Sequence, residues 1–284
     1  MFRLTGLPLL GAVLLMFGAG CNVLEDRSVC TSTLTVDLQE VDRTIKEWQM
    51  WLFNTEGELI YKDTIYRRSY GTRYTVEVPR YDDVQCLLWG NIRGATSLNE
   101  AYSLGTFMLK GHDISADSLY FCTDRISTNG EESYLKVVPN KEFATVDIYM
   151  KGWVGHDYDA TMELLCANSG FFVDKRICGS NTVTKMEVYD IGNYYTHFRG
   201  RILRQYDVEN LVLSLFITDR LPDGARGGVR LNKEIPLGEY LESNGYSMQS
   251  GAMGDISMEV DLSYNKLLVR AEDWSATYKL VEEI

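Results

Sequence analysis

Short segments in which apolar and polar residues alternate follow one another along most of the chain, and this pattern constrains the fold more than any other feature. Residues 32–39 place Leu34, Val36 and Leu38 on one side, which is the period of a strand with one buried face. Strands are likewise expected over residues 46–53, 58–66, 74–78, 84–91, 118–124, 133–138, 143–148, 182–189, 210–218, 256–264, 266–271 and 276–282. Eighteen Tyr and five Trp against five Pro also favour β structure. The chain of 284 residues is therefore predicted to be all-β.

The segment VQCLLWGN at residues 84–91 departs from this alternation. It is nearly all apolar, as expected of a strand buried on both faces, and it predicts a strand in the centre of a sheet. NTEG at residues 54–57 predicts the turn of a hairpin. One helical turn is expected near Leu98 to Leu104. The longest interval without an expected strand, residues 219–255, is rich in Gly and contains PLGEYLES, which predicts a short helix with Pro236 early in it.

A boundary is expected at VPN, residues 138–140, because a new alternation opens directly after it. The first part begins with TVDL at residues 35–38, and the second begins with TVDI at residues 145–148. This short sequence repeat is consistent with two similar units. About seven strands in the first part fit a β-sandwich. We therefore predict two tandem sandwich domains, residues 30–138 and 139–284.

The formal net charge of −12, with no block of Lys and Arg, argues against a protein that neutralises phosphates. Nucleic acid is accordingly not expected as a partner. The chain also carries no glycine-rich phosphate-binding loop or other nucleotide fingerprint.

The first twenty residues are typical of a targeting segment. Arg3 gives a positive start, LPLLGAVLLMF gives an apolar region too short to span a bilayer, and GAG gives small residues before a cleavage site. Residues 1–20 are thus expected to be a signal peptide that is removed after Gly20. An ordinary cysteine after an ordinary signal peptide is one interpretation of Cys21. The alternative, which we favour, is a bacterial lipoprotein.

FGAGC resembles a lipobox, in which the cysteine becomes the first residue and carries the lipid; Gly18 stands where that motif usually has Leu. Two or three acyl chains, such as palmitate, hold a protein stably on a membrane, since each buried methylene contributes about 0.8 kcal/mol. Cys21 would then be the membrane anchor and residues 21–29 a tether. The acidic pair Glu25 and Asp26 fits a solvated tether. It also resembles the acidic tags that direct some Bacteroidetes lipoproteins to the outer face of the outer membrane.

Five cysteines follow Cys21, and an odd number without a CxxC pair argues against a zinc site and a dense disulfide framework. Most of them are expected to be small core residues, and no bridge is predicted between Cys166 and Cys178. The histidines His112, His156 and His197 lie far apart in sequence and are interpreted as solvent or core residues rather than metal ligands.

Two pairs of acidic residues could serve as the catalytic acid and base of an enzyme, but the sequence supports this only weakly. Asp82 with Asp83, or Asp157 with Asp159, could form a glycosidase acid/base pair, but solvated loops account for them better. Trp48, Trp51 and Trp89 could form a sugar-binding platform, yet they lie inside apolar strands, where core packing is the better interpretation. No catalytic residue, cofactor site or metal site is predicted. The chain is therefore predicted not to be an enzyme.

The segments CNVLEDRSVC, STLTVDL, WLFNTEGELI, LLWGN, ATVDIYMKGW and AEDWSATYKL together resemble the FimB-type, or fimbrillin-associated, anchor lipoproteins of Bacteroidetes. The resemblance covers nearly the whole chain after Gly20, and its most specific parts are CNVLEDRSVC and LLWGN. It implies two transthyretin-like Greek-key β-sandwiches. It also implies a lipoprotein of the outer membrane, exposed at the cell surface, that anchors a type V pilus through pilin subunits.

The contact that this resemblance implies is strand addition, in which an extended strand joins a sheet edge without a small-molecule substrate. The terminal segment ATYKLVEEI, residues 276–284, could pair in this way in cis or in trans. Arg67 and Arg68 could attract an arginine-specific protease, but they are interpreted as a solvated hairpin end. The alternative function is a surface glycan-binding lipoprotein of a polysaccharide-uptake system, which would share the anchor, the tether and the fold class.

Overall fold

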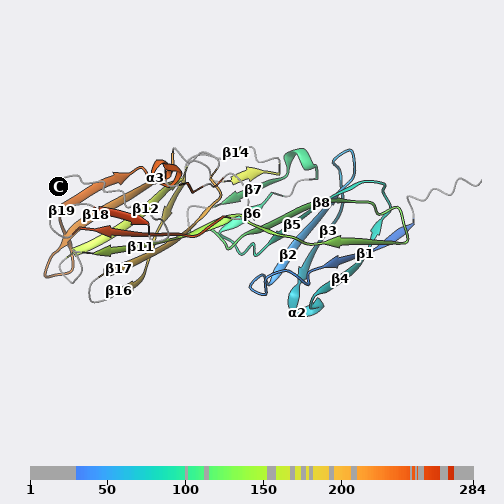
Figure 1. The fold of residues 1–284 in the computed structure, drawn as a ribbon, viewed down its shortest axis with the longest axis horizontal. Helices are drawn as coiled ribbons and strands as arrows, with labels where there is room; N and C mark the ends of the chain where they lie inside the picture. Colours follow the sequence, from blue (N-terminus) through green and yellow to red (C-terminus); the bar gives the residue numbers. More distant parts are fainter. Residues whose placement is uncertain are drawn as a thin grey trace, which may run out of the picture.

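A computed structural model describes residues 30–99, 102–111, 115–151, 158–166, 170–173, 177–178, 182–191, 195–205, 210–243, 245–246, 248, 253–262 and 268–271. Strands dominate this part of the chain, as predicted, and form an elongated molecule in which two β-sandwiches lie end to end (Figure 1).

The first sandwich packs a three-stranded sheet against a five-stranded sheet. The β1 sheet has the order β4-β1-β9, and β1 pairs antiparallel with β4 and parallel with β9. The β5 sheet has the order β10-β8-β5-β2-β3. The strands are β1 (Thr31–Asp37), β2 (Glu47–Phe53), β3 (Leu59–Tyr66), β4 (Arg73–Pro79), β5 (Val84–Gly90), β8 (Tyr120–Ile126), β9 (Glu132–Lys136) and β10 (Asn140–Lys141), with helix α2 (Arg67–Tyr70) after β3.

The second sandwich packs a five-stranded sheet against a four-stranded sheet. The β11 sheet has the order β16-β17-β11-β20-β21, and the β18 sheet has the order β15-β12-β18-β19. The elements are β11 (Phe143–Lys151), β12 (Tyr158–Cys166), β15 (Thr182–Lys185), β16 (Glu187–Ile191), β17 (Tyr195–Leu203), β18 (Val212–Arg220), β19 (Arg226–Ile235), helix α3 (Leu237–Ser243), β20 (Ile256–Asp261) and β21 (Leu268–Ala271). Helix α3 confirms the helix expected at PLGEYLES, whereas β12, β17 and β19 are strands that were not expected.

A bridging sheet takes strands from both halves of the sequence, in the order β14-β13-β7-β6. Strands β6 (Thr96–Leu98) and β7 (Met108–Gly111) flank the short helix η2 (Leu104–Thr106), close to the predicted helical turn, and β13 (Gly170–Phe172) and β14 (Ile177–Cys178) come from the second half. Strand β7 pairs antiparallel with β13, with Leu109 opposite Phe171. The two halves are therefore joined by main-chain hydrogen bonds as well as by the connecting chain (Figure 1).

The β5 sheet is covered on both faces. Its inner face places Trp48, Met50 and Leu88 against the β1 sheet. Its outer face places Trp51, Leu87 and Trp89 in a second cluster with Phe107 and Leu109 of the bridging region. Strand β5 lies between β8 and β2, so the prediction of a central, doubly buried strand at VQCLLWGN is confirmed.

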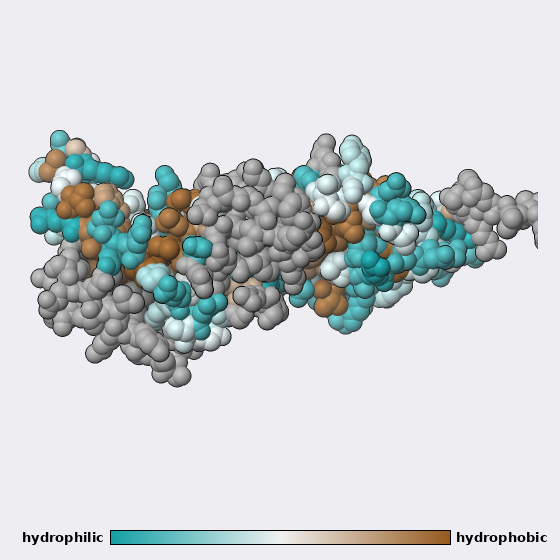
Figure 2. Space-filling view, turned by 90° about the horizontal axis from the view of Figure 1, so that it is seen from above, coloured by the Kyte–Doolittle hydropathy of each residue, from teal (hydrophilic) through white to brown (hydrophobic). Residues whose placement is uncertain are grey.

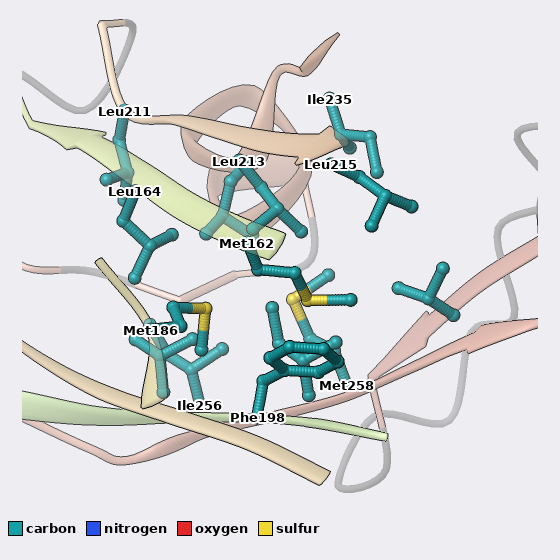
Figure 3. Packing of buried hydrophobic residues seen from close by; sticks show 14 of the residues in the cluster. Met162, Leu164, Met186, Phe198, Leu211, Leu213, Leu215, Ile235, Ile256 and Met258 are labelled. Carbon is teal, nitrogen blue, oxygen red and sulfur yellow. The ribbon is translucent and has the colours of Figure 1, made fainter. Parts of the chain in front are cut away.

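The core of the second sandwich lies between the β11 and β18 sheets. Figure 3 shows Phe198 and Met258 from the β11 sheet facing Met162, Leu213 and Leu215 from the β18 sheet. Several methionines share this core, and their flexible side chains fill irregular space between the two sheets.

The echo of TVDL and TVDI corresponds to equivalent strands. Strand β11, like β1, pairs antiparallel with one neighbour and parallel with another. Val36 and Val146 are both fully buried, while Asp37 and Asp147 lie on the outer faces of their sheets. The division into domains of residues 30–138 and 139–284 stays a prediction; β10 lies just after that boundary and pairs with β8.

Candidate attachment and interaction sites

The predicted attachment site lies outside the described residues. Gly20, Cys21 and the tether all precede Cys30, where the described chain begins. Cys30 is exposed, and β1 starts at the next residue. Seven residues of β1 are paired with β4 and five with β9. A tether that enters here therefore leads directly into the central strand of a sheet.

The outer face of the β11 sheet carries a cluster of charged and aromatic side chains. His197 Nε2 lies 2.6 Å from Asp147 Oδ1, and Arg199 Nε donates to the same oxygen at 2.6 Å. The Asp147 carboxylate raises the pKa of the Arg199 guanidinium through this hydrogen bond. His197 stacks on Tyr149 with ring centroids 4.4 Å apart, and the Arg199 guanidinium lies 4.1 Å from the ring centroid of Tyr189. The side chains that face solvent here are thus held by one another.

This cluster was not predicted as a site. The sequence placed His197 as a solvent or core residue, and in the structure it is buried at 5% exposure beside a carboxylate. Tyr189 is 63% exposed. Tyr and Arg are the residue types that most often anchor protein interfaces. The signal that could have found the cluster is the alternation of Tyr195, His197 and Arg199, which marks one face of β17.

The acidic residues considered as an acid/base pair serve surface contacts instead. Asp82 Oδ1 accepts a hydrogen bond from Asn129 Nδ2 at 2.7 Å, and Asp83 pairs with Arg125 at 2.8 Å. Asp159 pairs with Arg220. His112, His156 and Asp157 lie outside the described residues. Within the described ranges, no group of three or more His, Cys, Asp or Glu side chains could hold a metal ion.

The two arginines at residues 67 and 68 differ from each other. Arg67 donates from its guanidinium to the main-chain carbonyls of Val41 and Asp42, at distances between 2.7 and 3.2 Å. Arg68 is exposed and lies near the ring of Tyr66. The prediction of a solvated hairpin end therefore suits Arg68, whereas Arg67 joins the start of α2 to the loop before β2.

The segment LLWGN has a packing role in the β5 sheet. A Cβ atom at Gly90 would lie 2.8 Å from Ile45 Cγ2 and 3.1 Å from the ring of Trp48, so only glycine fits at the end of β5. Asn91 has a φ of 64°, a left-handed conformation that asparagine tolerates. Its side chain accepts from the Lys46 amide at 3.0 Å and donates to the Ser118 carbonyl at 3.2 Å. The motif thus fixes how the chain leaves the central strand.

The tryptophans and cysteines of the described strands belong to the core, as predicted. Trp48, Trp51 and Trp89 are at most 2% exposed, so none of these three forms a surface platform. Cys86, Cys122 and Cys166 are buried and free. Burial raises the pKa of the Cys166 thiol to about 12, which keeps it protonated and unreactive. The side chain of Cys178 lies outside the described residues.

Strand β19 is the longest edge strand in the described part of the chain, at ten residues. It pairs with β18 on one side, and this ladder is interrupted by irregularities at Thr218. Val229 is 60% exposed, and Arg230 is held by Asp219 at 2.7 Å. Irregular pairing and charged side chains are common devices that limit unspecific pairing at an edge. The predicted terminal strand at residues 276–284 lies outside the described residues.

Among the described residues, no helix has the length and apolar character needed to cross a membrane. Figure 2 shows hydrophilic residues over most of the visible surface of the first sandwich, with hydrophobic colour confined to small patches.

The sequence matches no protein-family model, and a search of curated proteins finds no match. Solved structures do match. A Bacteroides thetaiotaomicron protein, provisionally described as polysaccharide-binding, aligns with a TM-score of 0.61 and 16% identity over 88% of this chain and 99% of its own. A provisionally described adhesin from Bacteroides ovatus aligns with a TM-score of 0.61 and 11% identity over 89% of this chain and 96% of its own. The fimbrial anchor protein Mfa2 from Porphyromonas gingivalis aligns with a TM-score of 0.60 and 13% identity over 88% of this chain and 100% of its own.

The chain has the fold of these three proteins. The alignments span both sandwiches and nearly the full length of each matched protein, and none of the three is described as an enzyme. At identities of 11 to 16% the likeness concerns the fold. Function must therefore be argued from the chain itself.

Proposed function

We propose that this chain is an outer-membrane lipoprotein that anchors a type V pilus to the cell surface. The observation that carries the proposal is the fold, which the chain shares over nearly its whole length with a fimbrial anchor protein. The entry of the chain into β1, directly after the predicted tether, supports the same role. In this arrangement acyl chains on Cys21 hold the membrane, and the two sandwiches project from it.

The contact with pilin subunits is proposed to be strand addition. An extended strand that joins a sheet edge gains main-chain hydrogen bonds along its length, and its alternate side chains give specificity. Among the described edges, β19 offers the longest ladder, and the exposed Val229 gives an apolar contact beside it. The interaction is non-covalent and consumes no substrate, so no catalytic residue or cofactor is part of the proposal.

Mass spectrometry of the protein isolated from its own cells tests the anchor. We expect a mature chain that begins at Cys21 and carries acyl groups, because FGAGC precedes that cleavage site. The variant Cys21→Ala should leave the precursor uncleaved while both sandwiches fold. A mature chain that begins elsewhere, or a free thiol at Cys21, would contradict the proposal.

A pull-down of the lipidated protein separates this function from the alternative of a glycan-binding lipoprotein in a polysaccharide-uptake system. We expect fimbrial subunits to be captured with the wild-type chain. A variant with Val229→Lys should capture less of them if β19 is the pairing edge, while Val138→Lys, at a valine that is 64% exposed and lies outside β19, serves as the matched control. Capture of a carbohydrate transporter in place of a fimbrial subunit would favour the alternative.

A further inference from the structure

A polar cleft of about 440 Å³ lies where the two sandwiches meet. Part of its lining comes from the first sandwich, namely Thr44, Asn91, Arg93, Asp117, Ser118 and Tyr120. The rest comes from β10, β11, β17 and the segment before β20, namely Lys141, Phe143, Thr145, Arg201 and Asp255. Small-molecule sites commonly occupy clefts of about 300 to 1,000 Å³ at such junctions. The cleft is large enough for one or two sugar rings. Nothing in the proposed anchoring role uses it.

The two acidic groups of the cleft are already engaged. Asp117 Oδ2 accepts from the Arg93 amide at 2.8 Å, from the Thr96 amide at 3.0 Å and from Thr96 Oγ1 at 2.7 Å. Asp255 Oδ1 accepts from Lys141 Nζ at 2.6 Å and from the Thr145 amide at 2.8 Å. These hydrogen bonds satisfy the carboxylates and hold the walls of the cleft in place.

The two guanidinium groups of the cleft, on Arg93 and Arg201, have fewer hydrogen-bond partners among the described residues than the two carboxylates have. Among the described residues, the Arg201 guanidinium donates one hydrogen bond, from Nη1 to the carbonyl of Ala116 at 3.3 Å, and a guanidinium has five N–H donors. Arg93 is exposed, and no acidic side chain of the described residues pairs with it. On a chain of net charge −12, two such groups facing one cleft make a local exception. They suit a carboxylate, whose two oxygens match the guanidinium fork.

The rest of the lining suits a sugar ring rather than a bare anion. Thr44, Ser118 and Thr145 supply hydroxyl groups that both donate and accept. The half-buried ring of Tyr120 packs edge to face with Phe143, with centroids 5.7 Å apart, and gives the cleft an apolar wall. A mainly polar cleft with one aromatic wall fits a ligand that carries several hydroxyl groups and one charge.

We propose that this cleft binds an acidic saccharide, with the carboxylate of a uronic acid between Arg93 and Arg201 and the sugar ring against Tyr120. The site depends on both sandwiches, since Arg93 comes from the first and Arg201 from the second. It is independent of Cys21 and of the edge of β19. The chain would thus bind a surface or matrix glycan in addition to its fibre.

Calorimetric titration of the purified full chain with digalacturonic acid tests the proposal. We expect saturable binding, no binding of the neutral digalactose, and at least about tenfold weaker binding for Arg93→Gln or Arg201→Gln. Arg68→Gln removes the same charge from a separate cavity lined by Lys46, Glu47, Tyr66 and Arg67, and it should leave the affinity within about twofold. If Arg201→Gln perturbs folding, Arg93→Gln decides alone, because its side chain is exposed.

Four results would overturn the proposal. Equal affinity for digalactose would show that the charge is not recognised, and equal affinity for inorganic sulfate would show that the sugar is not. Tighter binding of a glutamate-rich peptide would assign the cleft to a protein partner. Equal loss in Arg68→Gln would show unspecific charge attraction.

Discussion

The β5 sheet and the β11 sheet have the same number of strands but differ in what covers them. Both bury one face in the core of a sandwich. The β5 sheet buries its other face as well, under the bridging region, whereas the β11 sheet leaves its other face to Asp147, His197 and the tyrosines. The sequences follow: β5 reads VQCLLWG, and β11 alternates as FATVDIYMK. The β5 sheet is thus stabilised by packing on both faces, whereas the β11 sheet carries charged and aromatic side chains on one face.

The largest effect is expected for Trp89→Ala in the β5 sheet. Trp89 is 1% exposed and stacks on Phe121 at 4.1 Å, so the truncation leaves a large cavity. Such truncations cost about 3 to 5 kcal/mol of the free energy of unfolding. Denaturant unfolding followed by circular dichroism measures the loss. Val188→Ala, at a half-exposed valine of the β11 sheet, is the control, with a change below about 0.5 kcal/mol. A near-neutral Trp89→Ala would mean that the outer face of the β5 sheet is not covered.

The second-largest loss of stability is expected at the connection between the β5 sheet and the β11 sheet. Glu142 lies between β10 and β11, and its carboxylate pairs with Arg204 Nε at 2.5 Å, with both side chains almost fully buried. Arg204 also donates to the carbonyls of Met248 and Lys141. Glu142→Gln removes the charge that pairs with a buried guanidinium and should cost about 3 kcal/mol in the same unfolding assay. Glu40→Gln removes an exposed ion pair with Lys136 and should have no measurable effect. Equal, small losses in both variants would contradict a buried connection.

A smaller effect is expected on the open face of the β11 sheet. Asp147→Ala removes the acceptor shared by the buried His197 and the partly exposed Arg199, and it should cost about 1 to 2 kcal/mol because the Arg199 guanidinium can be hydrated in its place. The variant should also raise the mobility of the Tyr189 ring, measurable by NMR relaxation. A loss as large as that of Trp89→Ala would show that this face is covered like the β5 sheet.

The smallest effect is expected for the pH dependence of stability and involves Asp255. Burial acts to raise the pKa of Asp255, but the Lys141 ammonium and the Thr145 amide stabilise its charged form, and the net pKa lies below the ordinary 3.8. A carboxyl with a lowered folded-state pKa stabilises the protein above pH 3.8 and loses this contribution as the pH falls through its folded pKa. Asp255→Asn should therefore be less stable than the wild type at pH 7, and the difference should disappear as the pH falls through the lowered folded-state pKa of Asp255. A difference that grows toward low pH would contradict the assignment.

The part of the fold that sequence could predict is the part in which local pattern and burial agree. The hairpin of β2 and β3, the central β5 and helix α3 are examples. Strand β19 escaped prediction because it is an edge strand with two glycines and mostly exposed side chains, so it shows no apolar period. The strands of the bridging sheet have two to four residues each and gain their stability from partners far away in sequence.

The candidate sites differ in the same way, because a site encoded by a local motif can be predicted from sequence and a site assembled from distant residues cannot. A cysteine after a short apolar segment predicts an attachment site by itself, because the processing signal is local. The cleft between Arg93 and Arg201 could not be predicted, because the two residues are 108 positions apart and meet only through the packing of the two sandwiches. Likewise Asp147 and His197 come together only when β11 pairs with β17.

The central claim is that this chain holds fibres on the cell through lipid on Cys21, and the fraction of fibres shed into the culture medium tests it most directly. Immunoblotting of cells and medium for the fimbrial subunit would compare the wild type with strains that carry Cys21→Ala or Cys30→Ala. The account predicts that Cys21→Ala releases most fibres into the medium, while Cys30→Ala, which changes an exposed cysteine nine residues away, retains them on the cells. Fibres that stay attached in wild-type amount in the Cys21→Ala strain would contradict the account.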